Sequence, residues 1–291
     1  MSSNANLLEL IPDKRKLIGV SINDLLENLL DTKNSTLIFL DIETLGMNPI
    51  FEYEQITEIA ATAVDSNNLQ KINSIHYKIE LSESANDLLE NSDGIQRFNW
   101  ERRQKRRGKT ALLDPKEILE LTNYYNNKAE TTTERIAIKK LHEFLEKYND
   151  PIIIAHNSDF DVSYIKTRSK FYSMTLKPLK VIDTLKISQF FFVPTLKTLT
   201  KDKDSIELSE KLTRKNSKTN HISSRLGDLS VAFGYSSKNW HTADADVEML
   251  QNVYLSILKY LKQKRNTNIY VQQKKEIDGK TKRRIRKKSK K

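Results

Sequence analysis

The chain of 291 residues contains no cysteine. Disulfide bonds and zinc sites built from cysteine are therefore excluded, and stability has to come from ordinary core packing. No N-terminal stretch combines a basic region with an uninterrupted apolar run, and no segment approaches the ~20 apolar residues needed to cross a bilayer. We therefore expect a soluble, intracellular and cytoplasmic protein without a membrane partner.

The net charge of +11 is concentrated at the C-terminal end. From Lys262 to Lys291 fourteen residues are basic and two are acidic, so the rest of the chain is close to neutral. A second cluster, residues 97–109, places seven basic residues and one acidic residue around Phe98 and Trp100. Cations for phosphates and rings for bases suit a nucleic-acid strand, although a solvated charged surface is the alternative for both segments.

The polarity pattern divides the chain into three parts. Apolar residues between Ile22 and Leu30 follow helical spacing, and this helix is expected either to pack on the same chain or to dock onto a partner protein. We expect an N-terminal helical extension over residues 1–34, a catalytic domain over 35–262 with surface insertions at about 95–133 and 193–224, and a basic, disordered tail over 263–291.

The order of apolar segments favours the α/β class. Three stretches rich in β-branched and aromatic residues come first and predict antiparallel strands, and two shorter ones follow between helices. The expected fold is a mixed five-stranded sheet flanked by helices. The strands are expected at 36–40, 55–64, 71–81, 152–155 and 180–185, and the helices at 134–148, from about 162, at 225–235 and at 242–261.

Asp41 and Glu43 end the first apolar run. In a strand, residues two apart point to the same face, so these carboxylates lie side by side. Two like charges held this close favour a cation between them, and Mg²⁺ prefers carboxylate oxygens. The segment alone is equally consistent with two solvated acids at an exposed strand end.

Two more acids, Asp161 and Asp246, stand near the ends of other core elements. Four converging carboxylates repel one another strongly, but a pair of Mg²⁺ or Mn²⁺ ions would make the cluster favourable and would support phosphodiester hydrolysis. His241 precedes Asp246 by five positions, about 140° away on a helical wheel, so it must lie on the loop before the helix to share the site. A histidine there has a pKa suited to a general base.

Three motifs now carry a resemblance. The DIET beginning at Asp41, the AHNSDFD of 155–161 and the HTADAD of 241–246 resemble those of DEDDh-family 3′–5′ exonucleases. This RNase H-like superfamily contains the epsilon proofreading subunit of bacterial polymerases, ribonuclease T and oligoribonuclease. The resemblance covers roughly residues 35–262 and implies an RNase H-like fold.

The resemblance also implies residue roles. Asp41, Glu43, Asp161 and Asp246 would bind two metal ions, and His241 would be the base. Contacts to the terminal nucleotide would come from four other residues: Thr44, Leu45, Asn157 and Phe160. The tyrosine-bearing branch of the family has Tyr where this chain has Thr242, so the histidine branch matches better.

Other polar residues near the motifs are interpreted as structural. Asp159 is not expected to be the ligand, because the family pattern places the ligand directly after Phe160. Asp244 would lie in the first turn of the last helix, where the helix dipole favours an acid. His76 lies outside the motifs and is expected to be structural or exposed.

The sequence therefore predicts a metal-dependent 3′–5′ exonuclease that releases nucleoside 5′-monophosphates from single-stranded 3′ ends, of DNA more than RNA. One alternative is a proofreading or accessory subunit bound to a polymerase or replication partner through residues 1–34 or the basic tail. Others are an RNA-trimming exoribonuclease and an RNase H-type endonuclease, in which the second acid comes from a helix.

Overall fold

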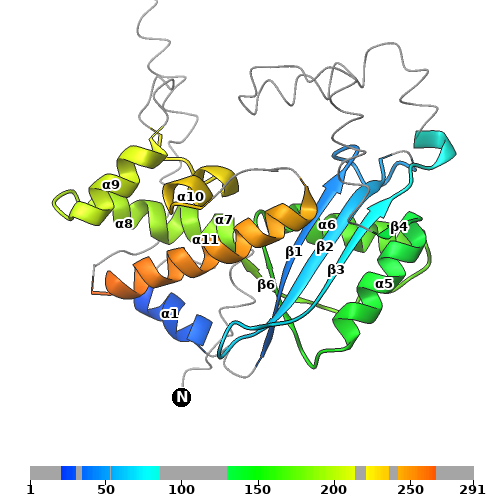
Figure 1. Ribbon diagram of the computed structural model, residues 1–291, viewed down its shortest axis with the longest axis horizontal. Coiled ribbons are helices and arrows are strands. Elements are labelled where there is room, and N and C mark those ends of the chain that lie inside the picture. Colours follow the sequence, from blue (N-terminus) through cyan, green and yellow to red (C-terminus); the bar gives the residue numbers. More distant parts are fainter. Residues whose placement is uncertain are drawn as a thin grey trace, which may run out of the picture.

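The computed structural model describes residues 21–30, 35–52, 54–85, 130–213, 221–235 and 242–266. In this part of the chain, six strands form one mixed sheet in the order β4-β3-β2-β1-β5-β6 (Figure 1). The α/β expectation is confirmed. The strands are β1 (Thr36–Thr44), β2 (Ile56–Asp65), β3 (Lys71–Ile79), β4 (Glu130–Thr132), β5 (Ile152–Ala155) and β6 (Lys180–Asp183).

The first three strands pair antiparallel, as expected, while β5 pairs parallel with β1, and β6 with β5. β1 is central, and alternate side chains along it enter two separate cores. Leu37 and Phe39 belong to one core and Ile38 and Leu40 to the other. Because β1 continues to Thr44, Asp41 and Glu43 belong to the same strand as the buried residues in the middle of the sheet.

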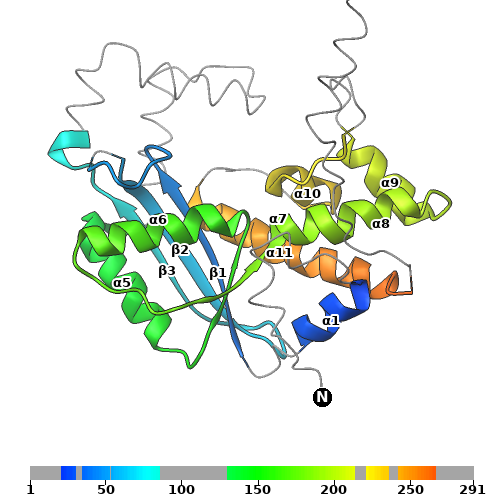
Figure 2. The same ribbon diagram turned by 180° about the vertical axis from the view of Figure 1, so that it is seen from behind.

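Helices cover both faces of the sheet. Figure 1 shows α11 crossing one face with α1 beneath it, and Figure 2 shows α5 and α6 on the other face. The apolar residues of α11, α10, η3 and α8 join one core, and those of α5 and α6 join the other. The helices are α1 (Ile22–Leu30), α5 (Glu134–Glu146), α6 (Ser158–Phe171), α7 (Thr184–Ile187), the π-helix η3 (Ser188–Phe192), α8 (Val193–Thr198), α9 (Lys203–Leu212), α10 (Leu226–Ala232) and α11 (Ala243–Gln263).

Three expectations differ from the structure. The sheet has a sixth strand, β4, whose three polar residues give no strand signal in the sequence. Helix α6 begins at Ser158, not near residue 162, so Asp161 lies in its first turn. The supposed surface insertion at 193–224 contains α8 and α9, and Leu196 and Leu212 are buried in the core because η3 and α10 cover them.

The N-terminal helix packs on its own chain, since Ile22 and Leu25 are buried in the core formed with α11. Most of the first insertion, the basic cluster 97–109 and the tail beyond residue 266 lie outside the described residues. Among the residues that the structure describes, no helix is long and apolar enough to cross a membrane.

Candidate nuclease active site

Three carboxylates from two elements meet at one end of β1. Asp41 and Glu43 come from β1, and Asp246 comes from the first turn of α11. One oxygen from each of the three lies within 4.8 Å of the other two. The alternation of β1 explains this, because both of its acids face the side of the sheet that α11 covers.

Asp161 reaches the same place from the opposite side. Its Oδ1 atom accepts a hydrogen bond of 3.3 Å from the backbone N–H of Ile42, the residue between the two β1 acids. Asp161 is buried in the first turn of α6, where the positive end of the helix dipole favours a carboxylate. The four acids predicted from the sequence are thus neighbours across β1, α6 and α11.

Asp183, at the end of β6, fixes where α6 begins. Its carboxylate accepts hydrogen bonds of 3.1 Å from the backbone N–H groups of Asn157 and Ser158. It also accepts from the N–H of Leu185 at 2.9 Å and so caps α7 as well. One buried side chain therefore sets the start of two helices, and through α6 it sets the position of Asp161.

The electrostatics of the cluster favour a bound cation. Burial raises the pKa of Asp41 well above its usual value, and the neighbouring charges of Asp161, Asp246 and Glu43 raise it further. Burial also raises the pKa of Asp161 to about 8, against the opposing effect of its backbone hydrogen bonds. The largest side-chain charge effects on these two carboxyls come from other acids, and such a set of oxygens fits hard divalent ions such as Mg²⁺ or Mn²⁺.

A second group of possible metal ligands lies beside the first. Glu58, His76 and Asp244 also offer atoms within 4.8 Å of one another, and Glu58 pairs with Glu43 across β1 and β2. The Nε2 atom of His76 lies 2.6 Å from Glu58 Oε1, and its Nδ1 atom lies 4.0 Å from Asp244 Oδ2. His76 therefore connects β2 to the first turn of α11, a role that its sequence position alone does not reveal.

The residues expected to contact a nucleotide lie around these acids. Thr44 ends β1 and its hydroxyl donates to the carbonyl of Gly46 at 2.7 Å, and the N–H of Leu45 donates to Gln55 at 3.1 Å. Asn157 is exposed, in a left-handed conformation with φ of 73° at the start of α6. Phe160 is half-buried one turn further along α6.

Three expectations concern single residues near the cluster. Asp159 points away from the acids, since its carboxylate is mostly exposed and forms an ion pair of 2.7 Å with Lys186. This agrees with its exclusion as a ligand. Asp244 lies in the first turn of α11, as expected. His241 lies outside the described residues, one position before Thr242, so its role as a base remains a prediction.

Proteins related by sequence include the 3′–5′ exonuclease DinG of Staphylococcus aureus strain MRSA252, which is 26% identical over 212 residues. The chain is similar to 3′–5′ exonucleases. The matched residues are 73% of this chain and 17% of the relative, so the chain spans less than a fifth of that protein. The same protein from strain USA300 is 25% identical over the same extent. No protein-family model matches the chain.

Solved structures of E. coli exonuclease I are also similar. A zinc-bound complex with single-stranded DNA has a TM-score of 0.48 and 18% identity, and the alignment covers 80% of this chain and 42% of that chain. A complex with a 5cy-dA13 oligonucleotide has a TM-score of 0.46 and 18% identity, covering 79% and 43%. The sequence relatives agree with the exonuclease resemblance carried by the three motifs.

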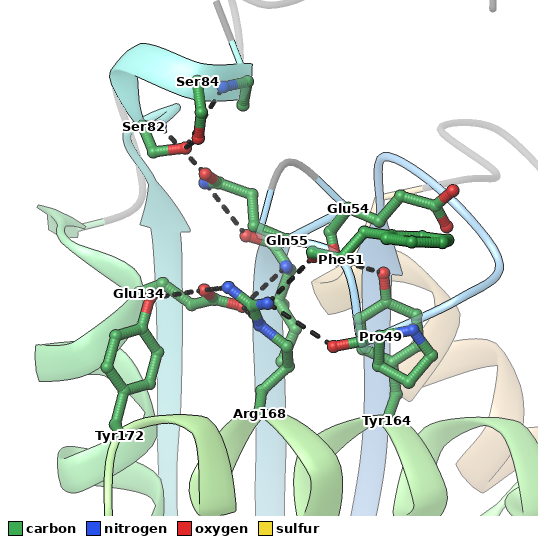
Figure 3. Close-up of polar contacts among 12 residues, drawn as sticks. Pro49, Phe51, Glu54, Gln55, Ser82, Ser84, Glu134, Tyr164, Arg168 and Tyr172 are labelled. Carbon is green, nitrogen blue, oxygen red and sulfur yellow. Dashed lines mark hydrogen bonds and ion pairs between the residues drawn. The ribbon is translucent and has the colours of Figure 1, made fainter.

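Several polar residues next to this exonuclease-like site have no signal in the sequence. Figure 3 shows them between α5, α6 and the loop from Leu45 to Gln55 that joins β1 to β2. Glu134 and Arg168 are a buried ion pair, and Tyr164 is buried next to them on α6. Asp183, the residue that caps α6 and α7, does have a signal in the sequence, because it stands at the end of an apolar run in the same way as Asp41.

Proposed function

We propose that this protein is a metal-dependent 3′–5′ exonuclease acting on single-stranded nucleic acid, DNA more than RNA, and releasing nucleoside 5′-monophosphates. The observation that carries the proposal is the convergence of Asp41, Glu43, Asp161 and Asp246 from β1, α6 and α11. Their mutual repulsion is a cost that a structural role would not explain, whereas divalent cations remove it.

In this proposal the four carboxylates are the ligands of two Mg²⁺ or Mn²⁺ ions. When bound, such a pair supplies the Lewis acidity needed for attack on a phosphodiester and for departure of the 3′ oxygen. His241, two positions before the start of α11 in the sequence, accepts the proton of the attacking water. Thr44, Leu45, Asn157 and Phe160 orient the terminal nucleotide beside the carboxylates.

The sequence relatives named 3′–5′ exonuclease support this direction of attack. The preference for a free end is tested with a circular or 3′-blocked strand, which an exonuclease leaves intact. The preference for DNA is tested by a time course with Mg²⁺ on end-labelled single-stranded DNA, duplex DNA and RNA of one sequence. Faster loss of RNA than of DNA would favour the RNA-trimming alternative.

The site assignment is tested with Asp161→Asn, which keeps the size of the side chain but removes a carboxylate ligand. We expect the rate of mononucleotide release to fall at least a hundredfold, since removing a ligand disrupts ion binding and charge stabilisation together. Asp159→Asn, two positions earlier and paired with Lys186, is the matched control and should retain wild-type activity. Equal activity of the two variants would contradict the assignment.

A further inference from the structure

The loop that joins β1 to β2, residues 45–55, directly follows the acidic pair and Thr44. It carries apolar side chains at the surface, including Ile50 at 72% and Phe51 at 44% exposure. An exposed loop of this kind would ordinarily be mobile. Its backbone is instead bound from below by buried polar side chains of α5 and α6 (Figure 3).

Arg168 supplies most of these contacts. Its Nη1 atom donates to the carbonyl oxygens of Phe51 at 3.1 Å and Pro49 at 3.4 Å. Its Nε and Nη2 atoms donate to the two carboxylate oxygens of Glu134. Arg168 is 1% exposed and Glu134 4%, so the guanidinium group is buried and makes its hydrogen bonds to other groups of the protein.

Glu134 extends the same network to the start of β2. Its Oε1 atom accepts a hydrogen bond of 2.8 Å from the N–H of Ile56, and Ile56 is the residue paired with Thr44 across the strands. A bulge in the β1–β2 pairing falls at Glu43 and Thr44, where the ladder itself gives less support. Glu134 therefore fixes the strand opposite the predicted nucleotide contact.

Tyr164 connects the loop to Phe160, another of the predicted nucleotide contacts. Its hydroxyl donates to the carbonyl of Glu54 at 2.6 Å, and its ring lies 5.4 Å from that of Phe160. Tyr164 is 1% exposed, and it links the β1–β2 loop to Phe160 on α6.

A buried ion pair contributes little net stability compared with apolar residues of the same size, so its presence here suggests a role in fixing one conformation. We propose that Arg168, Glu134 and Tyr164 are positioning residues that fix the β1–β2 loop, and thereby Thr44 and Leu45, in the conformation that receives the terminal nucleotide. The inference rests on the proposed exonuclease function. It assigns these three residues no contact with the substrate.

The test compares two buried tyrosines. Tyr164→Phe removes one hydroxyl that bonds to the loop. Tyr260→Phe removes a hydroxyl that bonds to Ser205 at 2.6 Å, between α11 and α9, and is the matched control. Each variant lacks about one hydrogen bond of the wild type, so both melting temperatures should fall by similar amounts.

We expect only Tyr164→Phe to raise KM for a single-stranded oligonucleotide, by about fivefold, with kcat changed less than twofold. Hydrolysis of bis(p-nitrophenyl) phosphate, which has no nucleoside to position, should be the same in wild type and both variants. Equal KM values for the two variants on the oligonucleotide would overturn the positioning role.

Truncating Arg168 alone would leave the Glu134 charge buried without a partner and could prevent folding. The paired change of Glu134→Leu with Arg168→Met removes both charges together. We expect it to retain a melting temperature near that of wild type while raising the oligonucleotide KM at least as much as Tyr164→Phe. If the folded double variant has the same KM as the wild type, the inference is overturned. If the wild-type enzyme itself releases no mononucleotides, the proposed function is overturned and the inference with it.

Discussion

Replacing Asp41 by Asn should stabilise the metal-free protein and weaken its response to metal. The side chain lies within 4.8 Å of the carboxylates of Glu43 and Asp246, and the largest charge effects on its pKa come from acids. At that distance and an effective dielectric constant of about 20, each pair of unit charges repels by about 3 kcal/mol. Proton uptake by the cluster reduces the net effect, so we expect a gain of about 1–3 kcal/mol and a melting temperature higher by about 3–10 °C.

The assay is thermal unfolding with a chelator and again with millimolar MgCl₂ or MnCl₂. Wild-type protein should gain about 2.7 kcal/mol when the metal is at 100 times its dissociation constant, and Asp41→Asn less than half of that. Asp159→Asn is the control, because its side chain is exposed and paired with Lys186, and it should respond to metal as wild type does. The reasoning is refuted if metal-free Asp41→Asn melts below wild type and both respond equally to metal.

Two further predictions concern the loop and the tail. In Gly46→Ala the new Cβ atom would lie 2.1 Å from Glu54 Oε2, so the Glu54 carboxylate must leave its hydrogen bond with the N–H of Asn48. We expect the KM for the oligonucleotide to rise severalfold in steady-state kinetics. An unchanged KM would count against a fixed loop. Deleting residues 267–291 keeps the pairing of Lys264 with Asp202 and removes most basic residues of the tail. If the tail binds phosphates, the deletion should flatten the plot of the logarithm of the DNA-binding constant against the logarithm of salt concentration. Its slope should become shallower by about 0.7 for each phosphate of a single strand that the tail neutralises. An identical slope would argue against this role.

The sequence alone determines much of the sheet and of the acid cluster, because both depend on local signals. Apolar runs of β-branched residues predict the five main strands, and period-two alternation predicts that Asp41 and Glu43 share a face. The three motifs add Asp161 and Asp246 through a family resemblance. The structure places these four acids near one another, as the motifs imply.

Other features were decided only by the tertiary structure. Helix α6 begins four residues before the expected start because Asp183, 25 positions later, accepts a hydrogen bond from the N–H of Ser158. The polar segment from 193 to 212 is helical and partly buried because neighbouring helices cover its few apolar residues. Neither effect can be read from a local window, since the deciding partner is distant in sequence.

The network beneath the loop shows the same limit most clearly. Arg168 bonds to Glu134 across 34 positions and to Phe51 across 117. Nothing in the sequence marks either charged residue as buried, because charged residues are seldom fully buried without a partner and these partners are distant in sequence. The sequence by itself thus determined which carboxylates carry the proposed chemistry. Only the tertiary structure decided which buried groups fix the loop beside them, since that depends on distant side chains meeting in space.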